Sequence, residues 1–238
     1  MAVGHPIGGV TVPPLMRVAL VYHCPQTTHR LDDALDAAGA AVERFHLESG
    51  DHVPGTDFDR AVILGGAMGA YDVDRHPWLE AEKDWIRKLV DSDVPVLGIC
   101  LGSQLLADSL GGRAFKAEVS EAAVVPISLT PVGEADPVVS KSGSMVYALH
   151  QDTFDLPPGA SLLAYTERFP HAFRLGSALA LQFHPDADRD LALAWGKEDE
   201  SILRAAGVEY DDYAQGLIAA DPQLDRDSRA IFTAWLAT

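Results

Sequence analysis

The chain has 238 residues, enough for one α/β domain with a full core or for two small ones. Its 35 acidic and 18 basic side chains give a net charge of −17, which argues against binding to nucleic acid or to an anionic membrane. The two cysteines, Cys24 and Cys100, are too few for a disulfide framework, and no segment resembles a signal peptide or a membrane span, so we expect a cytoplasmic protein.

Residues 1–14 are rich in glycine and proline, and we expect a flexible tail there, followed by a single domain over residues 15–238. Short apolar runs then alternate with helical patterns, which is typical of an α/β fold with a parallel sheet. The strands predicted in this half cover residues 17–22, 41–46, 60–64 and 94–99. Thr28 is a plausible N-cap of the first helix, Gly39 ends that helix, and Pro77 opens the second at its first helical position.

Gly65 and Gly66 directly follow the strand predicted over residues 60–64, and Gly69 comes soon after. Such a glycine-rich stretch must turn sharply or approach a ligand closely. The segment matches no phosphate-binding pattern and has no basic residue before Arg75, so we exclude a nucleotide site. It either supplies a backbone N–H to an oxyanion hole or is an ordinary turn between strand and helix.

Cys100 lies where the strand over residues 94–99 meets a helix predicted over residues 101–110. Gly98 and Gly102 flank it two positions away on each side, which gives the G-x-nucleophile-x-G pattern with cysteine in place of serine. A helix N-terminus stabilises a thiolate and a developing oxyanion, so a reactive thiol fits this position. The alternative is a small buried cysteine that closes a glycine-rich strand end.

After Gly112 the pattern changes to short strands separated by proline, glycine and serine. The strands predicted here cover residues 113–116, 122–129, 145–149, 161–165, 172–175 and 178–183. We expect a loop-like insert over residues 132–144 and a hairpin turn at Gly176. Beyond His184 the apolar residues recur at helical spacing, and these helices are expected to pack on the sheet.

A nucleophilic cysteine needs a base, because a thiol at its ordinary pKa is mostly protonated at neutral pH. His184 and His150 each follow a predicted strand, where catalytic groups of parallel sheets collect. We favour His184, because Asp186 two residues later can orient its imidazole; the alternative is a capped surface histidine in a turn. For His150 we favour a substrate-side or a structural role. The spacing of the histidines, and the lack of a second cysteine near Cys100 in the sequence, argue against a metal site.

Four segments resemble, in their order along the chain, motifs of the class I glutamine amidotransferases. They are the oxyanion loop at residues 64–72, the nucleophile motif at 98–107, a His-x-Asp segment of standalone members at 150–154, and the catalytic histidine motif at 182–185. The resemblance runs from about residue 17 to the end of the chain. It implies an α/β fold with an open, mostly parallel sheet flanked by helices, flavodoxin-like or Rossmann-like, that carries a Cys-His-acid triad.

By this resemblance Cys100 is the nucleophile, His184 the base and then the acid, and Asp186 the carboxylate that orients the imidazole. The backbone N–H groups of Gly66 and Leu101 would hold the oxyanion. The resemblance also implies that three further side chains contact the substrate, and that no cofactor or metal is needed. These three are Met68, Gln104 and His150.

Two positions depart from the family pattern. Asp186 stands where the family usually has glutamate, and Ser103 replaces a frequent histidine. Aspartate is one methylene shorter, so its hydrogen bond to the imidazole can lengthen. Triads with aspartate work on other folds, so we expect activity to survive.

The expected reaction is hydrolysis of the γ-carboxamide of glutamine, or of a γ-glutamyl amide, through a cysteine thioester. Roughly fifty residues follow His184, too few for a nucleotide-binding domain, so ammonia would pass to a separate synthetase or acceptor subunit, or the enzyme acts alone on γ-glutamyl amides. One alternative is a weak or inactive regulatory or binding relative of the same fold, which the change at Asp186 favours. Another is a cysteine peptidase on a similar sheet, which the spacing of His184 and Asp186 fits poorly.

Overall fold

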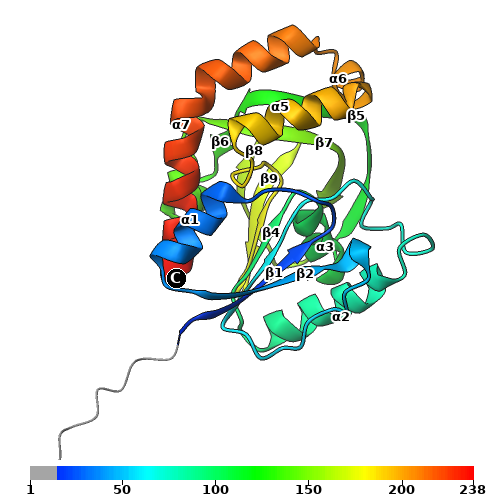
Figure 1. The fold of residues 1–238 in the computed structure, drawn as a ribbon, viewed down its shortest axis with the longest axis vertical. Helices are drawn as coiled ribbons and strands as arrows, with labels where there is room; N and C mark the ends of the chain where they lie inside the picture. The colour runs from blue at the N-terminus through cyan, green and yellow to red at the C-terminus, as the bar shows by residue number, and fades with distance from the viewer. Residues whose placement is uncertain (1–14) are drawn as a thin grey trace, which may run out of the picture.

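The computed structural model describes residues 15–238, so the tail predicted over residues 1–14 lies outside the described residues. An eight-stranded sheet runs through the molecule in the order β2-β1-β3-β4-β10-β9-β8-β6 (Figure 1). Its parallel strands are β2 (Ala41–His46), β1 (Arg17–Tyr22), β3 (Arg60–Ile63), β4 (Val96–Ile99) and β10 (Ala178–Leu181). Its antiparallel strands are β9 (Pro170–Leu175), β8 (Ser161–Tyr165) and β6 (Ser128–Leu129). The predicted open, mostly parallel sheet is confirmed.

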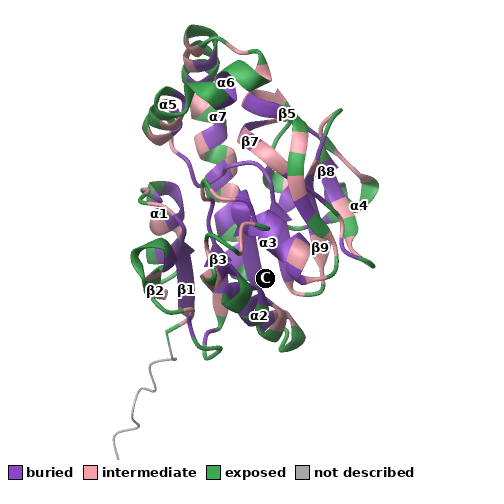
Figure 2. Ribbon diagram, turned by 90° about the vertical axis from the view of Figure 1, so that its right-hand side faces the viewer, coloured by how far each residue is buried: buried purple, intermediate pink, exposed green. Residues whose placement is uncertain are grey.

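Helices cover both faces of this sheet, which explains why its central strands are apolar throughout (Figure 2). On one face α1 (His29–Ala37) and α7 (Tyr210–Ala237) pack against each other and against alternate strand residues such as Val18. On the other face, α2 (Trp78–Asp91) and α3 (Leu101–Ser109) cover the alternate strand residues that point to that side. The carboxyl ends of the parallel strands are left free to carry a site.

A separate two-stranded antiparallel sheet, β5 (Arg113–Pro126) with β7 (Met145–Asp155), lies beside the main sheet. Over it lie α5 (Arg189–Glu198), α6 (Glu200–Ala206) and the first half of α7 (Figure 1). Apolar side chains from all five elements form a third core cluster, so the C-terminal helices pack on strands as expected.

The structure corrects several predicted elements of the second half. The strands predicted over 113–116 and 122–129 are one long strand, β5, with a register shift between Lys116 and Glu121, and the separate short strand β6. The strand predicted to end at Leu149 continues to Asp155, because β5 pairs with it along its whole length. The insert over 132–144 was wrong as a loop: α4 (Pro131–Ala135) and the 3₁₀ turn η2 (Val139–Lys141) occupy it, and Thr130 caps α4.

Of the four local signals predicted at helix ends and turns, two are confirmed and two are wrong in part. Gly39 and Gly176 both have positive φ angles, 65° and 56°, as a helix end and a hairpin turn require. Thr28 precedes α1 but its side chain makes no capping bond, since it donates to the carboxylate of Asp32 instead. Pro77 lies one position earlier than predicted, before the first residue of α2. Another 3₁₀ turn, η1 (Leu47–Ser49), follows β2.

No helix within residues 15–238 is long and apolar enough to cross a membrane. The expectation that these residues act as one domain stays a prediction.

Candidate active site

Cys100 occupies a strained turn between β4 and α3. Its φ is 52° and its ψ is −108°, a conformation that residues with a side chain rarely adopt. The flanking glycines are required by close packing: a Cβ at Gly98 would lie 2.4 Å from the carbonyl oxygen of Gly102, and one at Gly102 would lie 2.1 Å from that of Ile63. The predicted elbow is therefore present, and Cys100 occupies the N-cap position of α3.

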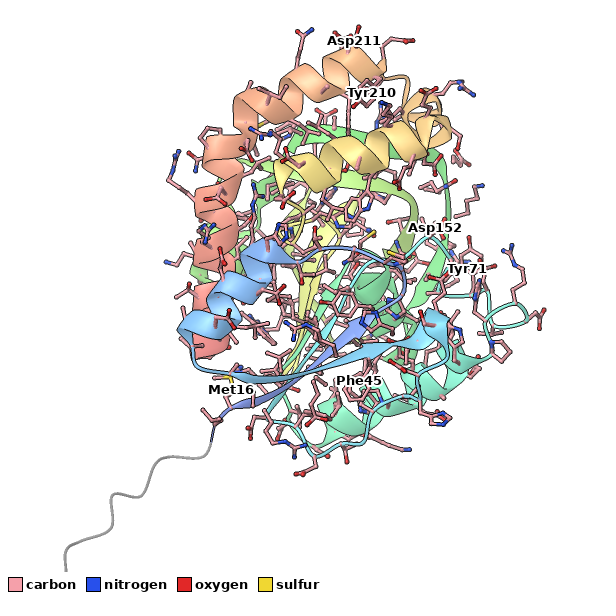
Figure 3. The ribbon with its side chains drawn as sticks, viewed as in Figure 1. Met16, Phe45, Tyr71, Asp152, Tyr210 and Asp211 are labelled. Carbon is pink, nitrogen blue, oxygen red and sulfur yellow. The ribbon has the colours of Figure 1, made fainter. Side chains whose placement is uncertain are left out.

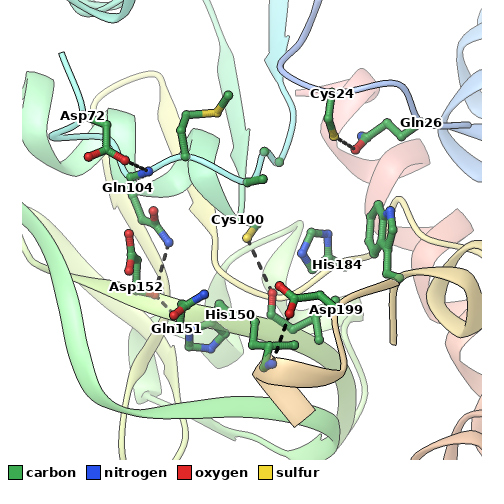
Figure 4. Close-up of a pocket in the computed structure, with 18 of the residues that line it drawn as sticks. Cys24, Gln26, Asp72, Cys100, Gln104, His150, Gln151, Asp152, His184 and Asp199 are labelled. Carbon is green, nitrogen blue, oxygen red and sulfur yellow. Dashed lines mark hydrogen bonds between the residues drawn. The ribbon is translucent and has the colours of Figure 1, made fainter. Parts of the chain in front are cut away.

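His184 follows the end of the neighbouring strand, β10, by three residues, and its imidazole lies beside Cys100 (Figure 4). A Cβ at Gly65 would lie 3.1 Å from Cε1 of His184 and 3.5 Å from Cβ of Cys100. The backbone N–H of His184 donates to the carbonyl of Tyr147 at 2.8 Å, which fixes this segment to β7. The ring of His184 also makes an edge contact with Trp195, with ring centroids 5.0 Å apart.

The carboxylate of Asp186 is fully buried and lies 3.1 Å from Nδ1 of His184. The side-chain amide of Gln26 donates to its other oxygen at 3.4 Å. A carboxylate at this position keeps a proton on Nδ1 of His184, so Nε2 is the ring nitrogen that points away from Asp186. The shorter aspartate therefore reaches the imidazole, and the predicted trio of Cys100, His184 and Asp186 is brought together in space.

Burial by itself lowers the pKa of His184, because it disfavours the charged imidazolium. The negative charges of the Cys100 thiolate and of Asp186, and hydrogen bonds to both groups, outweigh this effect and raise the pKa to about 10. The site therefore favours the protonated form of the His184 imidazole, next to Cys100 and Asp186.

The backbone N–H groups of Gly66 and Leu101, the predicted oxyanion donors, have no hydrogen-bond partner among the described residues. The two residues are in contact, because a Cβ at Gly66 would lie 2.7 Å from Cδ2 of Leu101. Leu101 begins α3, where the N–H groups of the first turn lack intrahelical acceptors. Free donors at this point are what an oxyanion hole needs.

A pocket of about 750 Å³ opens above Cys100 and His184. Its walls come from the loop after β1, the Gly65–Gly69 turn, the middle of β7, and the ends of α5 and α6. Met68, Gln104 and His150, the three predicted substrate contacts, all line it. The amide nitrogen of Gln104 already donates to the carbonyl of Asp152 at 3.1 Å and to Gln182 at 3.3 Å, so the side chain is held in place.

Asp152 and Tyr71 lie close together at one side of this pocket, from β7 and from the loop after β3 (Figure 3). Burial and the neighbouring carboxylates raise the pKa of Tyr71 to about 12, so the phenol stays a donor. This pair links the loop after β3, which carries Gly65 and Gly66, to the two-stranded sheet.

The glutamine amidotransferase class-I family matches residues 20–192. The chain belongs to this family.

Several curated members of the family are similar to it. In Natronomonas pharaonis, one subunit of the glutamine-hydrolysing GMP synthase is 34% identical over 157 residues, 64% of this chain and 77% of that protein. The GMP synthase of Thermomicrobium roseum is 36% identical over 130 residues, and the matched region spans only 23% of that longer protein. The glutamine amidotransferase-like protein YfeJ of Salmonella typhimurium is 30% identical over 139 residues, 56% of this chain and 58% of YfeJ.

Solved structures agree on the fold over nearly the whole chain. A glutamine amidotransferase of Thermotoga maritima has a TM-score of 0.81 at 23% identity and covers 94% of this chain and 99% of its own. A glutamine amidotransferase of Methylobacillus flagellatus has a TM-score of 0.83 at 22% identity, with 94% and 95% covered. These likenesses extend the class I fold to the C-terminal helices beyond residue 192.

In this class I domain the sequence analysis missed two side chains next to the site. His23 follows β1 and is fully buried beneath the oxyanion loop, where its Nδ1 lies 3.1 Å from the carbonyl of Leu64. Cys24, the next residue, lines the same pocket as Cys100 although the two are far apart in sequence. Burial raises the pKa of Cys24 to about 12, and both cysteines are free thiols, so Cys24 is the unreactive one. Their position directly after β1, at the sheet edge where Cys100 and His184 also lie, is the sequence feature that could have indicated them.

Proposed function

We propose that this class I amidotransferase domain hydrolyses the γ-carboxamide of glutamine, or of a γ-glutamyl amide, through a thioester on Cys100. The observation that carries the proposal is the elbow thiol of Cys100 beside His184, whose Nδ1 lies 3.1 Å from the buried Asp186. Family membership supports glutamine amide hydrolysis at the level of the family.

The reaction proceeds in two halves. The Cys100 thiolate attacks the amide carbon, and the N–H groups of Gly66 and Leu101 stabilise the oxyanion. His184, as imidazolium, gives its Nε2 proton to the departing nitrogen, so the C–N bond breaks and ammonia or an amine leaves. Neutral His184 then takes a proton from water and the hydroxide attacks the thioester carbonyl. The C–S bond breaks, glutamate is released and the Cys100 thiolate is regenerated.

The test of the chemistry is a single substitution with a covalent probe. Cys100→Ala should lose turnover of every substrate while its circular dichroism spectrum stays that of the wild type. A glutamine-like electrophile should label the wild type at one site, and peptide mass spectrometry should place it on Cys100. Full turnover in Cys100→Ala would exclude the mechanism. A wild type that neither turns over nor takes the label would support the inactive or regulatory relative instead.

The size of the pocket supports a γ-glutamyl amide with a substituent on nitrogen over free glutamine. About 750 Å³ is within the range of pockets that hold drug-sized ligands, and Trp195, Glu198 and Ile202 from α5 and α6 extend it beyond the triad. A panel of glutamine and γ-glutamyl amines, read out by glutamate release, separates the two. A higher kcat/KM for γ-glutamyl amines than for glutamine would support a substituted amide as the substrate, and a preference for glutamine would overturn it.

The relatives support a second arrangement, in which a separate synthetase or acceptor subunit takes up the ammonia. The Natronomonas pharaonis relative is by name one subunit of a GMP synthase. Under this arrangement the purified chain has slow glutaminase activity that rises when the synthetase is added. Steady, fast glutamine hydrolysis by the chain alone would contradict it.

A further inference from the structure

Three side chains with metal-binding atoms meet beside the pocket, outside the proposed triad. They are Glu121 on β5, His150 on β7 and His171 on β9, and one ligand atom of each lies within 4.8 Å of the others. All three residues are buried. Glu121 Oε2 lies 3.3 Å from Nε2 of His150 and 2.7 Å from Nε2 of His171. The cluster links the two-stranded sheet to the main sheet.

The hydrogen bonds of His150 decide which atom faces the carboxylate. Its Nδ1 lies 3.0 Å from the backbone carbonyl of Asp152, an acceptor only, so Nδ1 carries a hydrogen. In the neutral ring Nε2 then presents a lone pair to Glu121, and two electron-rich atoms would face each other at 3.3 Å. A positive charge at this contact, from a metal ion between the two atoms or from a second ring proton, turns it from repulsive to attractive.

The charges around Glu121 also favour a bound cation. Among residues 15–238 the only basic side chains within 4.0 Å of its carboxylate are the two imidazoles, which are charged only when protonated, and no lysine or arginine lies that close. Its other oxygen accepts from the hydroxyl of Thr166 at 3.2 Å, which is a neutral donor. Beside two neutral imidazoles the buried carboxylate has no positive partner, which is costly, and a divalent ion would supply the missing charge.

We propose that Glu121, His150 and His171 form a binding site for one transition-metal ion, with Zn²⁺ the best match. Two imidazole nitrogens and one carboxylate oxygen are a ligand set that zinc accepts, and all three are borderline or hard donors with no thiolate. The bond from His150 Nδ1–H to a backbone carbonyl is the outer contact that metal-bound histidines usually make. The ion holds β5, β7 and β9 together and fixes the β7 segment at Gln151 and Asp152 that lines the pocket. It plays no part in the thioester chemistry.

The test is a metal titration of the full chain, purified without a histidine tag and stripped with a chelator. The Cys100→Ala background is used, because the thiol and His184 could bind a metal themselves. Co²⁺ should bind at one ion per chain with visible d–d bands and without the near-ultraviolet band of a sulfur ligand, and Zn²⁺ should displace it. Zn²⁺ at 100 times its Kd should raise the melting temperature by about 5–10 °C.

His171→Gln is the diagnostic variant, because glutamine can still donate a hydrogen bond to Glu121 while offering zinc no imidazole. We expect at least about 100-fold weaker Co²⁺ binding. His52→Gln removes an exposed histidine elsewhere and should bind as the parent does. If His171→Gln fails to fold, Glu121→Gln replaces it with the same expectation.

Two results would overturn the site. One is the absence of stoichiometric Co²⁺ or Zn²⁺ binding to the parent protein. The other is unchanged binding in the folded cluster variants. If the parent binds no metal and nitrogen NMR shows protons on both ring nitrogens of His150, an imidazolium supplies the charge instead and the proposal is wrong.

Discussion

Nε2 of His23 lies 3.0 Å from both carboxylate oxygens of Glu82, and neither side chain has any exposed surface. Nδ1 of the same ring lies 3.1 Å from the carbonyl of Leu64. Both ring nitrogens thus face atoms that only accept, so His23 is an imidazolium and the pair is ionic. The pair lies directly under the oxyanion loop, because a Cβ at Gly66 would be 2.7 Å from Cβ of His23.

Glu82→Gln should therefore change both stability and its pH dependence. Burial lowers the pKa of His23, but Glu82 and the carbonyls of Leu64 and Gly65 raise it overall above its ordinary value. A raised histidine pKa contributes stability that is complete below about pH 6.5 and is lost as the pH rises through the folded-state pKa. The variant should lose about 3 kcal/mol at pH 6 and show a flatter dependence of unfolding free energy on pH above 6.5. Urea denaturation between pH 6 and 9 measures both.

Glu80→Gln, on an exposed position of the same helix, is the matched control and should stay within about 1 kcal/mol of the wild type. Because the pair supports the oxyanion loop, Glu82→Gln should also lower kcat more than it changes KM. A pH dependence of stability equal to that of the wild type would show that His23 is neutral.

The sequence predicted the parts of the site that follow from strand ends. Cys100 and His184 each follow a short buried strand, and in a parallel sheet such positions meet at one edge whatever the strand order. The contacts of His23 with Glu82 and of His171 with Glu121 could not be predicted. They join residues 59 and 50 positions apart, and they depend on which helix packs on which strand and on how the second sheet lies.

The strands of the second half of the chain were also predicted incompletely, because their extent depends on tertiary pairing. The long strands β5 and β7 contain charged and polar residues that break the local pattern, so each was predicted too short. Their mutual pairing extends them, and this moves His150 from a predicted strand end to the middle of β7. Tertiary pairing outweighed local propensity here.

Asp186→Asn tests the orientation and charge of the His184 imidazole. The negative charge of Asp186 is one of the interactions that raise the pKa of His184 to about 10, so its removal should lower that pKa. We expect kcat to fall by about 100-fold or more, and the alkaline limb of the kcat/KM profile to move to lower pH. Asp186→Glu, which keeps the charge, should retain activity within about tenfold of the wild type. An alkaline limb at the same pH in Asp186→Asn would mean that Asp186 does not act on His184.

Gly102→Ala tests the packing of the elbow. Its Cβ would lie 2.1 Å from the backbone oxygen of Ile63, which cannot move without disturbing the sheet. We expect a loss of about 3 kcal/mol or more in unfolding free energy, measured by chemical denaturation. Gly216→Ala, in an exposed part of α7 with nothing within 4 Å of the new Cβ, should instead stabilise by about 1 kcal/mol. Equal stability of the two variants would contradict the close contact between α3 and β3.

Arg30→Met tests how the segment that carries Asp186 is anchored. The buried guanidinium of Arg30, on α1, donates at 2.8 Å to the carbonyl of Ala187 and at 2.8 Å to the carboxylate of Asp221 on α7. Methionine has a similar length but offers no donor to either acceptor, and the carbonyl of Ala187 loses its partner, so we expect a loss of about 3 kcal/mol. Because Ala187 directly follows Asp186, kcat should fall as well.

Arg229→Met is the matched control for this charge removal. Arg229 also joins α7 to α1, through Asp33 at 2.8 Å, but its side chain is 48% exposed. Exposed ion pairs contribute little, so this variant should lose less than about 1 kcal/mol and keep its kcat. If Arg30→Met and Arg229→Met were equally stable and equally active, the buried guanidinium would not position the catalytic segment, and the support of Asp186 would come from His184 and Gln26 alone.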